Sequence, residues 1–395
     1  MLLDIPPLDA RLPAKVDGRV QALYSALSEA HANAANEAAL PLVHAHLLRT
    51  SGLLALPVPA QFGGQGASWG TTFSIIARLA KIDAAFANRL GTHYLQLGSV
   101  MLLGDADQQG ELLFGTAHRD WVWASAFSAA NTGVRASVTA DTIEINGTPT
   151  FHHGLEDADR VLLSAQMTDG SGGIAMTVEC VRAGIVRTSQ RRVGTPAGEI
   201  QTALEFRRLR VARDETLGDT LNRPTVRATL RPLLEQMISL HVFVGIAHGA
   251  LETLLRASRD RTRIRAAEGS ELSPFLVQRY ADMWVDLKAA LAMAASVTRA
   301  FEEAWTEGEA LSSDERTRLA LEIAEARLLV GRAGQQMMQA VLEAKSRPGV
   351  ESRAALERFW RALRAFGPND PVDFRRRELG RWLMEGATPR ASVFI

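Results

Sequence analysis

Histidine and cysteine are the first side chains to consider for metal binding and nucleophilic chemistry in this chain. The sequence holds nine histidines and a single cysteine, Cys180. His152 and His153 are neighbours in a segment expected to be a strand, so their side chains point to opposite faces and cannot readily share a metal ion. The chain has no HExxH or paired-cysteine motif, which argues against metalloprotease and cysteine-based zinc-site chemistry. We therefore predict no metal site.

The composition is that of an ordinary globular protein. Lys plus Arg equals Asp plus Glu at 44 each, so no overall field attracts nucleic acid or an anionic membrane. A lone cysteine can form neither an internal disulfide nor a cysteine-based zinc site. Residues 1–7 contain an acid and two prolines where a signal peptide needs basic and apolar residues, and no window approaches the roughly 20 apolar residues of a membrane span. We therefore expect a cytoplasmic protein that binds neither nucleic acid nor membranes.

The secondary structure that must position these side chains is predicted to change type twice along the chain. Residues 16–114 show the period of amphipathic helices. Between about 121 and 217 the period falls to two, and turn signals such as Asn146-Gly147 separate short strands. From about 231, three apolar seams recur at alternating spacings of four and three, which predicts antiparallel helices with knobs-into-holes packing. A last helical stretch near residues 372–384 could complete a bundle of four.

This order predicts an α+β fold of three domains, because 395 residues are too many for one compact core. The predicted domains are an N-terminal helical domain over 1–118, a small β-barrel or sandwich over 119–225, and an antiparallel four-helix bundle over 226–395. Ser312 and Glu315 have the spacing of a capping box at the start of the third bundle helix.

The same order, together with local segments, resembles the acyl-CoA dehydrogenase superfamily. The match is patchy but runs from about residue 50 to residue 385, and its segments come in the family's order: 59–66 (Pro-Ala-Gln-Phe-Gly-Gly-Gln-Gly), 81–87, 123–128, 147–154 with Asp157-Ala158-Asp159, and 245–251. The resemblance implies a flavin, FMN or FAD, held between the helical front, the β domain and the bundle.

Within that superfamily, the C-terminal region is similar to one branch. Residues 356–364, followed by Asp370-Pro371-Val372, resemble flavin-dependent monooxygenases that oxidise small sulfur- or nitrogen-containing molecules. Those proteins use oxygen and reduced FMN made by a separate flavin reductase. The usual catalytic glutamate of true acyl-CoA dehydrogenases falls in the loop 365–370, which contains no Glu here. The resemblance therefore favours a monooxygenase for a small heteroatom-containing or aromatic substrate.

The resemblance also implies which residues bind the flavin. Phe127, Ser128, His152 and His153 fall on the two strands that border the flavin ring in the family. Arg261 matches an arginine that the family places on the flavin phosphate, where a guanidinium can bind bidentately; a solvated turn is the alternative. Superfamily members are commonly tetramers, so we expect a homotetramer or homodimer in which this arginine reaches the neighbouring subunit's flavin.

Two positions would govern oxygen chemistry if the monooxygenase resemblance holds. His93 stands where that branch carries a histidine facing the flavin, and its usual pKa near neutrality suits proton transfer to or from a peroxide; a core histidine is the alternative. Asn369 occupies the place of a second histidine, and Phe366 replaces another. An amide can orient a peroxide but cannot transfer a proton, so these replacements put ordinary hydroperoxide chemistry in doubt.

Two alternatives stay open at this point. Glu235 falls close to a second position at which the superfamily carries a base, so the chain could be an FAD-dependent acyl-CoA dehydrogenase in which Glu235 removes an α-proton. A glutamate near a helix start is also favoured by the helix dipole without any catalytic role. Asn369 and Phe366 would equally fit a non-catalytic bundle or assembly subunit.

Overall fold

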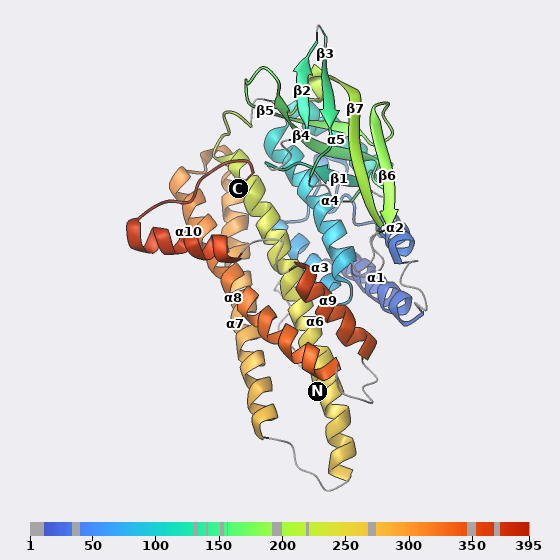
Figure 1. Cartoon of the computed structure of the whole chain (residues 1–395), viewed down its shortest axis with the longest axis vertical. Helices are drawn as coiled ribbons and strands as arrows, with labels where there is room; N and C mark the ends of the chain where they lie inside the picture. The colour runs from blue at the N-terminus through green and yellow to red at the C-terminus, as the bar shows by residue number, and fades with distance from the viewer. Residues whose placement is uncertain are drawn as a thin grey trace.

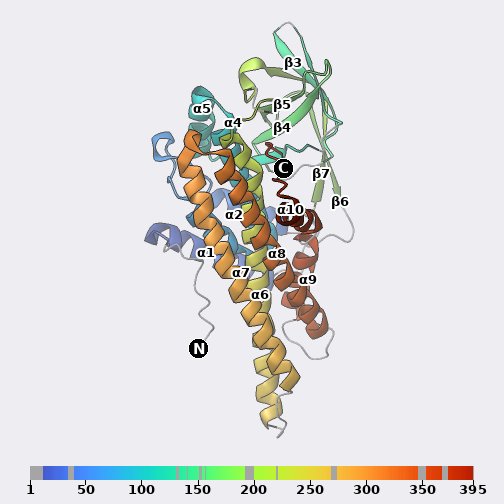
Figure 2. The ribbon, with the colours of Figure 1, turned by 90° about the vertical axis from the view of Figure 1, so that its left-hand side faces the viewer.

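A computed structural model describes residues 12–33, 40–129, 133–139, 141–150, 154–155, 157–191, 200–218, 221–267, 274–345, 353–366 and 372–394. Helices come first, a sheet follows and long helices return, which matches the predicted α+β order. The sheet lies at one end of the long helices, and the shorter N-terminal helices pack along their upper half (Figures 1 and 2).

Three of the N-terminal helices begin at residues whose side chains cap them. Ser68, Asp83 and Asp105 each accept a hydrogen bond from a backbone N–H in the first turn, which satisfies a donor that the helix itself leaves unpaired. The helices are α1 (Ala14–Asn33), α2 (Leu40–Thr50), α3 (Trp69–Ala80), α4 (Ala84–Leu103) and α5 (Ala106–Arg119). Helix α4 is buried along most of its length, so it is the inner helix of this group.

The strands form one seven-stranded sheet, a half-barrel rather than a sandwich of two sheets. They are β1 (Trp123–Ala126), β2 (Arg135–Val138), β3 (Thr142–Gly147), β4 (Arg160–Met167), β5 (Gly173–Glu179), β6 (Ile185–Arg191) and β7 (Ile200–Ala212). The order is β1-β4-β2-β3-β7-β6, with β5 paired to the other side of β4. Strand β1 runs parallel to β4, with Trp123 opposite Arg160 and Ala126 opposite Leu163. This pairing fixes where the chain leaves β1, which matters for the site.

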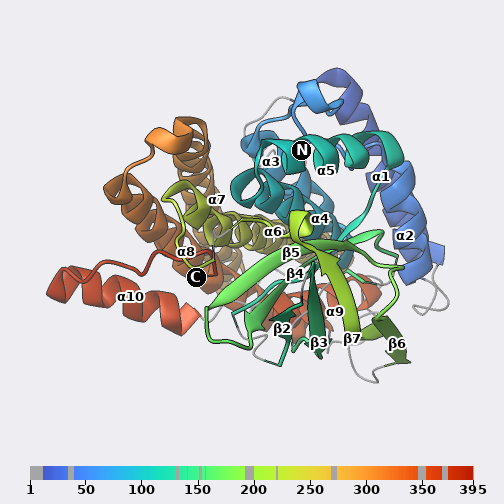
Figure 3. The same cartoon turned by 90° about the horizontal axis from the view of Figure 1, so that it is seen from above.

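Within the residues that the structure describes, five α-helices follow the sheet, and four of them pack together. They are α6 (Arg231–Ala267), α7 (Pro274–Glu307), α8 (Ser313–Lys345), α9 (Arg353–Phe366) and α10 (Val372–Glu385). Helix α9 packs against α6 and α8 and is the fourth member of the bundle. The predicted fourth helix, α10, contacts α8 instead and projects from the side of the molecule (Figure 3). The predicted capping box is confirmed, since the Glu315 N–H donates to Ser312 Oγ while Glu315 Oε2 accepts from the Ser312 N–H.

The described residues form two separate hydrophobic cores. One runs from Val16 to Val393 and joins the N-terminal helices to the bundle, with Trp123, Phe127 and a few further sheet residues at its border. The other lies within the sheet alone. The residue ranges 1–118 and 226–395, predicted as two domains, therefore share one core, and their boundaries remain a prediction.

One helix of the described chain is long and apolar enough to cross a membrane. This is Arg227–Arg259, and 72% of its most apolar window is buried inside the protein. The expectation that no segment would reach such apolarity was therefore wrong. The helix is apolar because it lies at the centre of the larger core, where α3, α4, α7, α8 and α9 all contact it.

Candidate functional site

The candidate site lies where β1 ends and α6 begins. Phe127 and Ser128 follow β1 directly. The Ser128 N–H donates to Ser164 Oγ at 3.1 Å, and the Ser164 hydroxyl donates back to Ser128 O at 3.2 Å. These two bonds hold the chain against β4. The buried Phe127 ring stacks on the ring of Phe394, with 4.8 Å between the ring centroids.

Arg231, the first residue of α6, faces the same ring. Its Cζ lies 4.1 Å from the Phe127 ring centroid, and its side chain is only 2% exposed. Nη1 donates to Glu235 Oε2 at 3.2 Å, one turn along the helix. Burial lowers the pKa of the Arg231 guanidinium from its usual value, and the Glu235 carboxylate opposes that shift. We call the residues that meet here the Phe127–Arg231 cluster: Phe127, Ser128, Ser164, Arg231, Glu235 and Phe394.

Glu235 lies in this cluster, but it is placed poorly for a base. Its side chain is 51% exposed, and its carboxylate is the partner of Arg231. A carboxylate that removes an α-proton needs to stand free over its substrate. The geometry therefore favours a structural role for Glu235, as an ion-pair partner near the helix start, over a role in proton abstraction.

His93 is held by backbone groups on both sides of its ring. The Trp123 N–H donates to Nδ1 at 3.2 Å, so Nδ1 carries no proton, and Nε2–H donates to Leu54 O at 2.8 Å. Burial lowers the pKa of His93 to about 4. Both ring nitrogens are thus engaged in joining α4 to β1 and to the loop at Leu54. These contacts favour a structural role for His93 in the core. The predicted role of His93 at the flavin remains a prediction that these contacts do not support.

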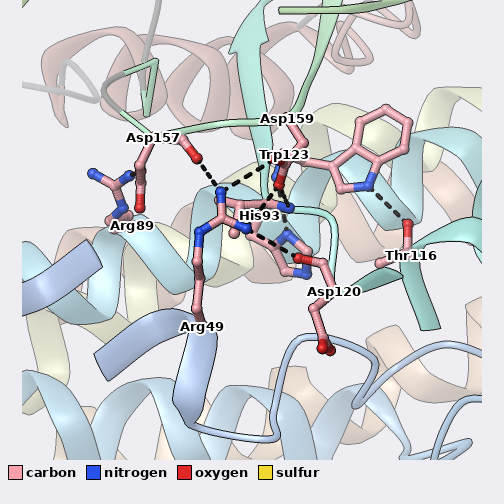
Figure 4. A network of polar contacts seen from close by, with 9 residues as sticks. Arg49, Arg89, His93, Thr116, Asp120, Trp123, Asp157 and Asp159 are labelled. Atoms are coloured by element: carbon pink, nitrogen blue, oxygen red, sulfur yellow. Dashed lines mark hydrogen bonds and ion pairs between the residues drawn. The ribbon is translucent and has the colours of Figure 1, made fainter. Parts of the chain in front are cut away.

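A polar network around His93 fixes the start of β1 (Figure 4). Trp123 Nε1–H donates to Thr116 Oγ1 at 2.9 Å. Arg49 Nη1 pairs with Asp159 Oδ2 at 3.0 Å, and the same carboxylate oxygen accepts from the Val122 N–H at 2.8 Å. Arg89 forms an ion pair with the carboxylate of Asp157. The acids of the segment 157–159 therefore have structural partners on α2 and α4.

The remaining predicted site residues cannot be placed at this cluster. His152, His153 and Asn369 lie outside the described residues, as does the side chain of Phe366. Arg261 belongs to α6, about 45 Å along the helix from Arg231 at 1.5 Å per residue. One subunit therefore does not bring Arg261 to the Phe127–Arg231 cluster.

Arg231 itself was missed by the reasoning from sequence. A signal for it exists, because the helix dipole disfavours a cation in the first turn. Arg231 stands there all the same, before Pro232 and an apolar run. An arginine at an unfavourable helix position, next to a buried strand end, is a reasonable sign of a functional guanidinium.

Comparisons with known proteins decide the family. The family described as "Acyl-CoA dehydrogenase, N-terminal domain" matches residues 20–120, and "Acyl-CoA dehydrogenase, C-terminal domain" matches residues 237–367. The chain is 32% identical over 361 residues to the probable FMNH2-dependent monooxygenase SfnC of Pseudomonas putida, covering 90% of this chain and 91% of the relative. The chain belongs to the acyl-CoA dehydrogenase superfamily.

Within this superfamily, the relatives place the chain in the FMNH2-dependent monooxygenase branch. Dibenzothiophene monooxygenase of Rhodococcus erythropolis is 27% identical over 363 residues, covering 87% of this chain and 86% of the relative. The structure of methanesulfinate monooxygenase MsuC from Pseudomonas fluorescens has a TM-score of 0.86 at 27% identity, over 97% of this chain and all of that one. TdsC from Paenibacillus sp. A11-2, solved with FMN and indole, has a TM-score of 0.85 at 26% identity, with coverage of 97% and 100%.

The predicted flavin-dependent monooxygenase is thus confirmed over the dehydrogenase and the non-catalytic subunit, and the flavin bound by the solved relative TdsC is FMN. Glutaryl-coenzyme A dehydrogenase, at 15% identity and a TM-score of 0.76, shares the fold alone. The Phe127–Arg231 cluster combines an aromatic face with a buried cation, a combination of side chains that can hold an anionic aromatic cofactor such as FMN.

Proposed function

We propose that this monooxygenase oxygenates the sulfur atom of a small molecule, with FMNH2 supplied by a separate flavin reductase. The match to SfnC over 90% of the chain carries the proposal. The names of two further relatives, a methanesulfinate monooxygenase and a dibenzothiophene monooxygenase, point to sulfur as the oxidised atom. The ion pair of Glu235 with Arg231 supports the same choice, because it leaves that carboxylate occupied.

Reduced FMN, when bound, would supply the two electrons and two protons with which one atom of O2 is added to sulfur and the other is released as water. The residues of this chain bind and orient the reactants. Phe127 offers an apolar ring at the end of β1, and the paired hydroxyl and backbone bonds of Ser128 and Ser164 keep that strand end fixed. Arg231 offers the positive charge.

We also propose that the enzyme works as a homo-oligomer, a tetramer or a dimer. Arg261 lies near the far end of α6 from the Phe127–Arg231 cluster. Its predicted role at a flavin phosphate therefore requires the flavin of a second subunit. A small-molecule substrate and a flavin reductase complete the expected partners, and the cytoplasmic location remains a prediction.

Isotope labelling tests the proposed reaction. The purified protein would be incubated with FMN, NADH, a flavin reductase, 18O2 and either methanesulfinate or dibenzothiophene. We expect one 18O atom in the oxidised sulfur product, measured by mass spectrometry, and none when the protein is omitted. Oxidation of NADH with only hydrogen peroxide and no labelled product from either compound would contradict the proposal. Formation of an enoyl-CoA from an added acyl-CoA would instead support the dehydrogenase.

A further inference from the structure

The guanidinium of Arg231 has more hydrogen-bond donors than partners. Nη1 donates to Glu235, whereas Nε and Nη2 are buried and have no hydrogen-bond partner in the described part of the chain. A buried cationic donor that lacks a partner is costly, because the protein offers it nothing in exchange for lost water. Such an arrangement is expected where a ligand completes the set.

The two donors without partners form one edge of the guanidinium. In the planar group, Nε–H and one Nη2–H point the same way, so together they match the two oxygen atoms of a planar or pyramidal oxyacid. The edge used for Glu235 is the other one. Arg231 can therefore bind an anion bidentately without giving up its bond to Glu235.

Another fully buried arginine, Arg316, makes protein contacts along the edge that Arg231 leaves open. Arg316 donates from Nε to Thr229 Oγ1 at 3.1 Å and from Nη2 to Thr229 O at 3.3 Å. Its side-on edge is thus satisfied by the protein itself. Arg231 differs because that same edge is left open, next to the aromatic face of Phe127.

We propose that Arg231 binds the acidic group of the substrate, and that this substrate is a small organic sulfinate. This inference rests on the proposed sulfur oxygenation and gives its substrate class. The guanidinium holds the two sulfinate oxygens, and the sulfur lone pair stays available to accept an oxygen atom. The balance is RSO2⁻ + O2 + FMNH2 → RSO3⁻ + FMN + H2O, in which sulfur is oxidised from sulfinate to sulfonate.

The surroundings of Arg231 indicate that its anionic ligand is the acidic group of the substrate rather than the phosphate of FMN. Arg231 sits against an apolar ring rather than among other cations, whereas phosphates bind where several donors converge. Arg261, the predicted phosphate ligand, lies in the arginine-rich end of α6, which carries Arg259, Arg261, Arg263 and Arg265. A neutral sulfur heterocycle would leave the Arg231 edge without a partner.

Binding measured without turnover tests the inference separately from the oxygenation. Titration calorimetry would compare methanesulfinate with the neutral dimethyl sulfone for the full-length protein and for Arg231→Gln. We expect the Kd for methanesulfinate to rise about 10- to 100-fold in Arg231→Gln, as for a lost charge-assisted bond. Binding of dimethyl sulfone and of FMN should change by less than about threefold, because neither uses that edge. Arg227→Gln is the matched control, because Arg227 is a nearby arginine that pairs with Glu309 at 3.2 Å. This variant should bind methanesulfinate with the same Kd as the unmutated protein.

Thermal melting guards against a variant that simply fails to fold. Arg231→Met removes a poorly solvated cation, so its ligand-free Tm should equal or exceed that of the unmutated protein. Methanesulfinate should raise the Tm of the unmutated protein and of Arg227→Gln, and should leave that of Arg231→Met unchanged. Glu235→Gln, which removes a negative charge close to the proposed anion site, should tighten methanesulfinate binding. Arg231→Lys, which keeps the charge and loses the fork, should bind with intermediate affinity.

Three results would overturn the inference. The first is a Kd for methanesulfinate that Arg231→Gln leaves unchanged. The second is a loss of FMN binding in that variant while methanesulfinate binding stays intact, which would show that the Arg231 guanidinium binds the cofactor. The third is the absence of methanesulfinate binding by the unmutated protein while labelled oxygen still enters dibenzothiophene. That result would support the proposed sulfur oxygenation and exclude a sulfinate as the substrate.

Discussion

His93 and His241 show how the fold uses histidine where a catalytic imidazole could have been expected. His241 donates from Nδ1 to Met237 O at 2.8 Å and stacks on Phe73 at 4.9 Å between ring centroids. Burial lowers the pKa of each imidazole to about 4, from an ordinary value of 6.5. Both are therefore neutral hydrogen-bonding side chains of the core at physiological pH.

This burial predicts a loss of stability on mild acidification. As the pH falls from 6.5 towards 4, the unfolded chain binds protons at both histidines while the folded chain does not. The free energy of unfolding should therefore decrease across this window, by about 2 kcal/mol or more, and change little through these residues above pH 7. Urea denaturation at several pH values would measure it. The double variant His93→Gln, His241→Gln should give a shallower slope, and a slope equal to that of the unmutated protein would contradict this assignment.

At the residue scale, the roles assigned from the sequence remain predictions, but three of the residues lie together. Phe127, Ser128 and Glu235 were singled out, and the structure brings all three into one cluster. The partners of His93 could not be predicted, because they are backbone groups of Leu54 and Trp123 that only the folded chain brings near. Arg231 was missed although its place in the first turn of a helix is a signal in the sequence. Which of its donors lack a protein partner could not be predicted, because only the folded chain determines those contacts.

Helices α3 and α6 approach each other closely along two glycines of α6. A Cβ added at Gly245 would lie 2.3 Å from Ala77 O, and one at Gly249 would lie 2.4 Å from Lys81 O. No side chain fits at such distances without moving a backbone. The absence of a side chain at these two positions therefore sets the spacing between α3 and the helix that begins at Arg231.

A larger residue at this contact should destabilise the protein. Gly245→Val forces α3 and α6 apart, and we expect it to lower the free energy of unfolding by about 1–3 kcal/mol or more. Gly380→Ala on α10 is the control. A Cβ there meets nothing within 4 Å, so the better helix propensity of alanine should leave stability equal or slightly raised. Denaturant unfolding of the two variants side by side would check this, and equal stability of Gly245→Val would show that the contact gives way without cost.

The elements themselves were predictable where a period runs long enough. The apolar seams of α6, α7 and α8 are buried as expected, for example at Met237, Leu287 and Ile323. The single half-barrel could not be distinguished from a sandwich, because strand alternation is the same in both and the parallel pairing of β1 with β4 is non-local. The choice of α9 over α10 as the fourth helix depends likewise on packing between distant segments.

On the scale of the whole molecule, α10 carries apolar side chains that nothing in the described chain covers. Leu383 and Met384 are 68% and 86% exposed, and Phe374 and Trp382 are also open to solvent. Clusters of this kind commonly mark protein interfaces. They agree with the proposed homo-oligomer, in which a second subunit would cover α10.

Charges on this surface should disrupt the assembly. We expect light scattering coupled to size-exclusion chromatography to give a dimer or tetramer for the unmutated protein, and a smaller species for Leu383→Glu with Met384→Lys. Val181→Glu is the control, because Val181 is 80% exposed but lies in the turn after β5. A monomeric mass for the unmutated protein would exclude the shared use of Arg261.

The shared core of the N-terminal helices and the bundle has a consequence during protein synthesis. Helix α3 finds its main partner, α6, only after the whole sheet has been translated. At roughly 5–20 residues per second, its apolar face waits about ten seconds or longer for that partner. The nascent chain should therefore need chaperone protection until α6 leaves the ribosome, and ribosomes paused within the sheet would carry a chain prone to aggregate.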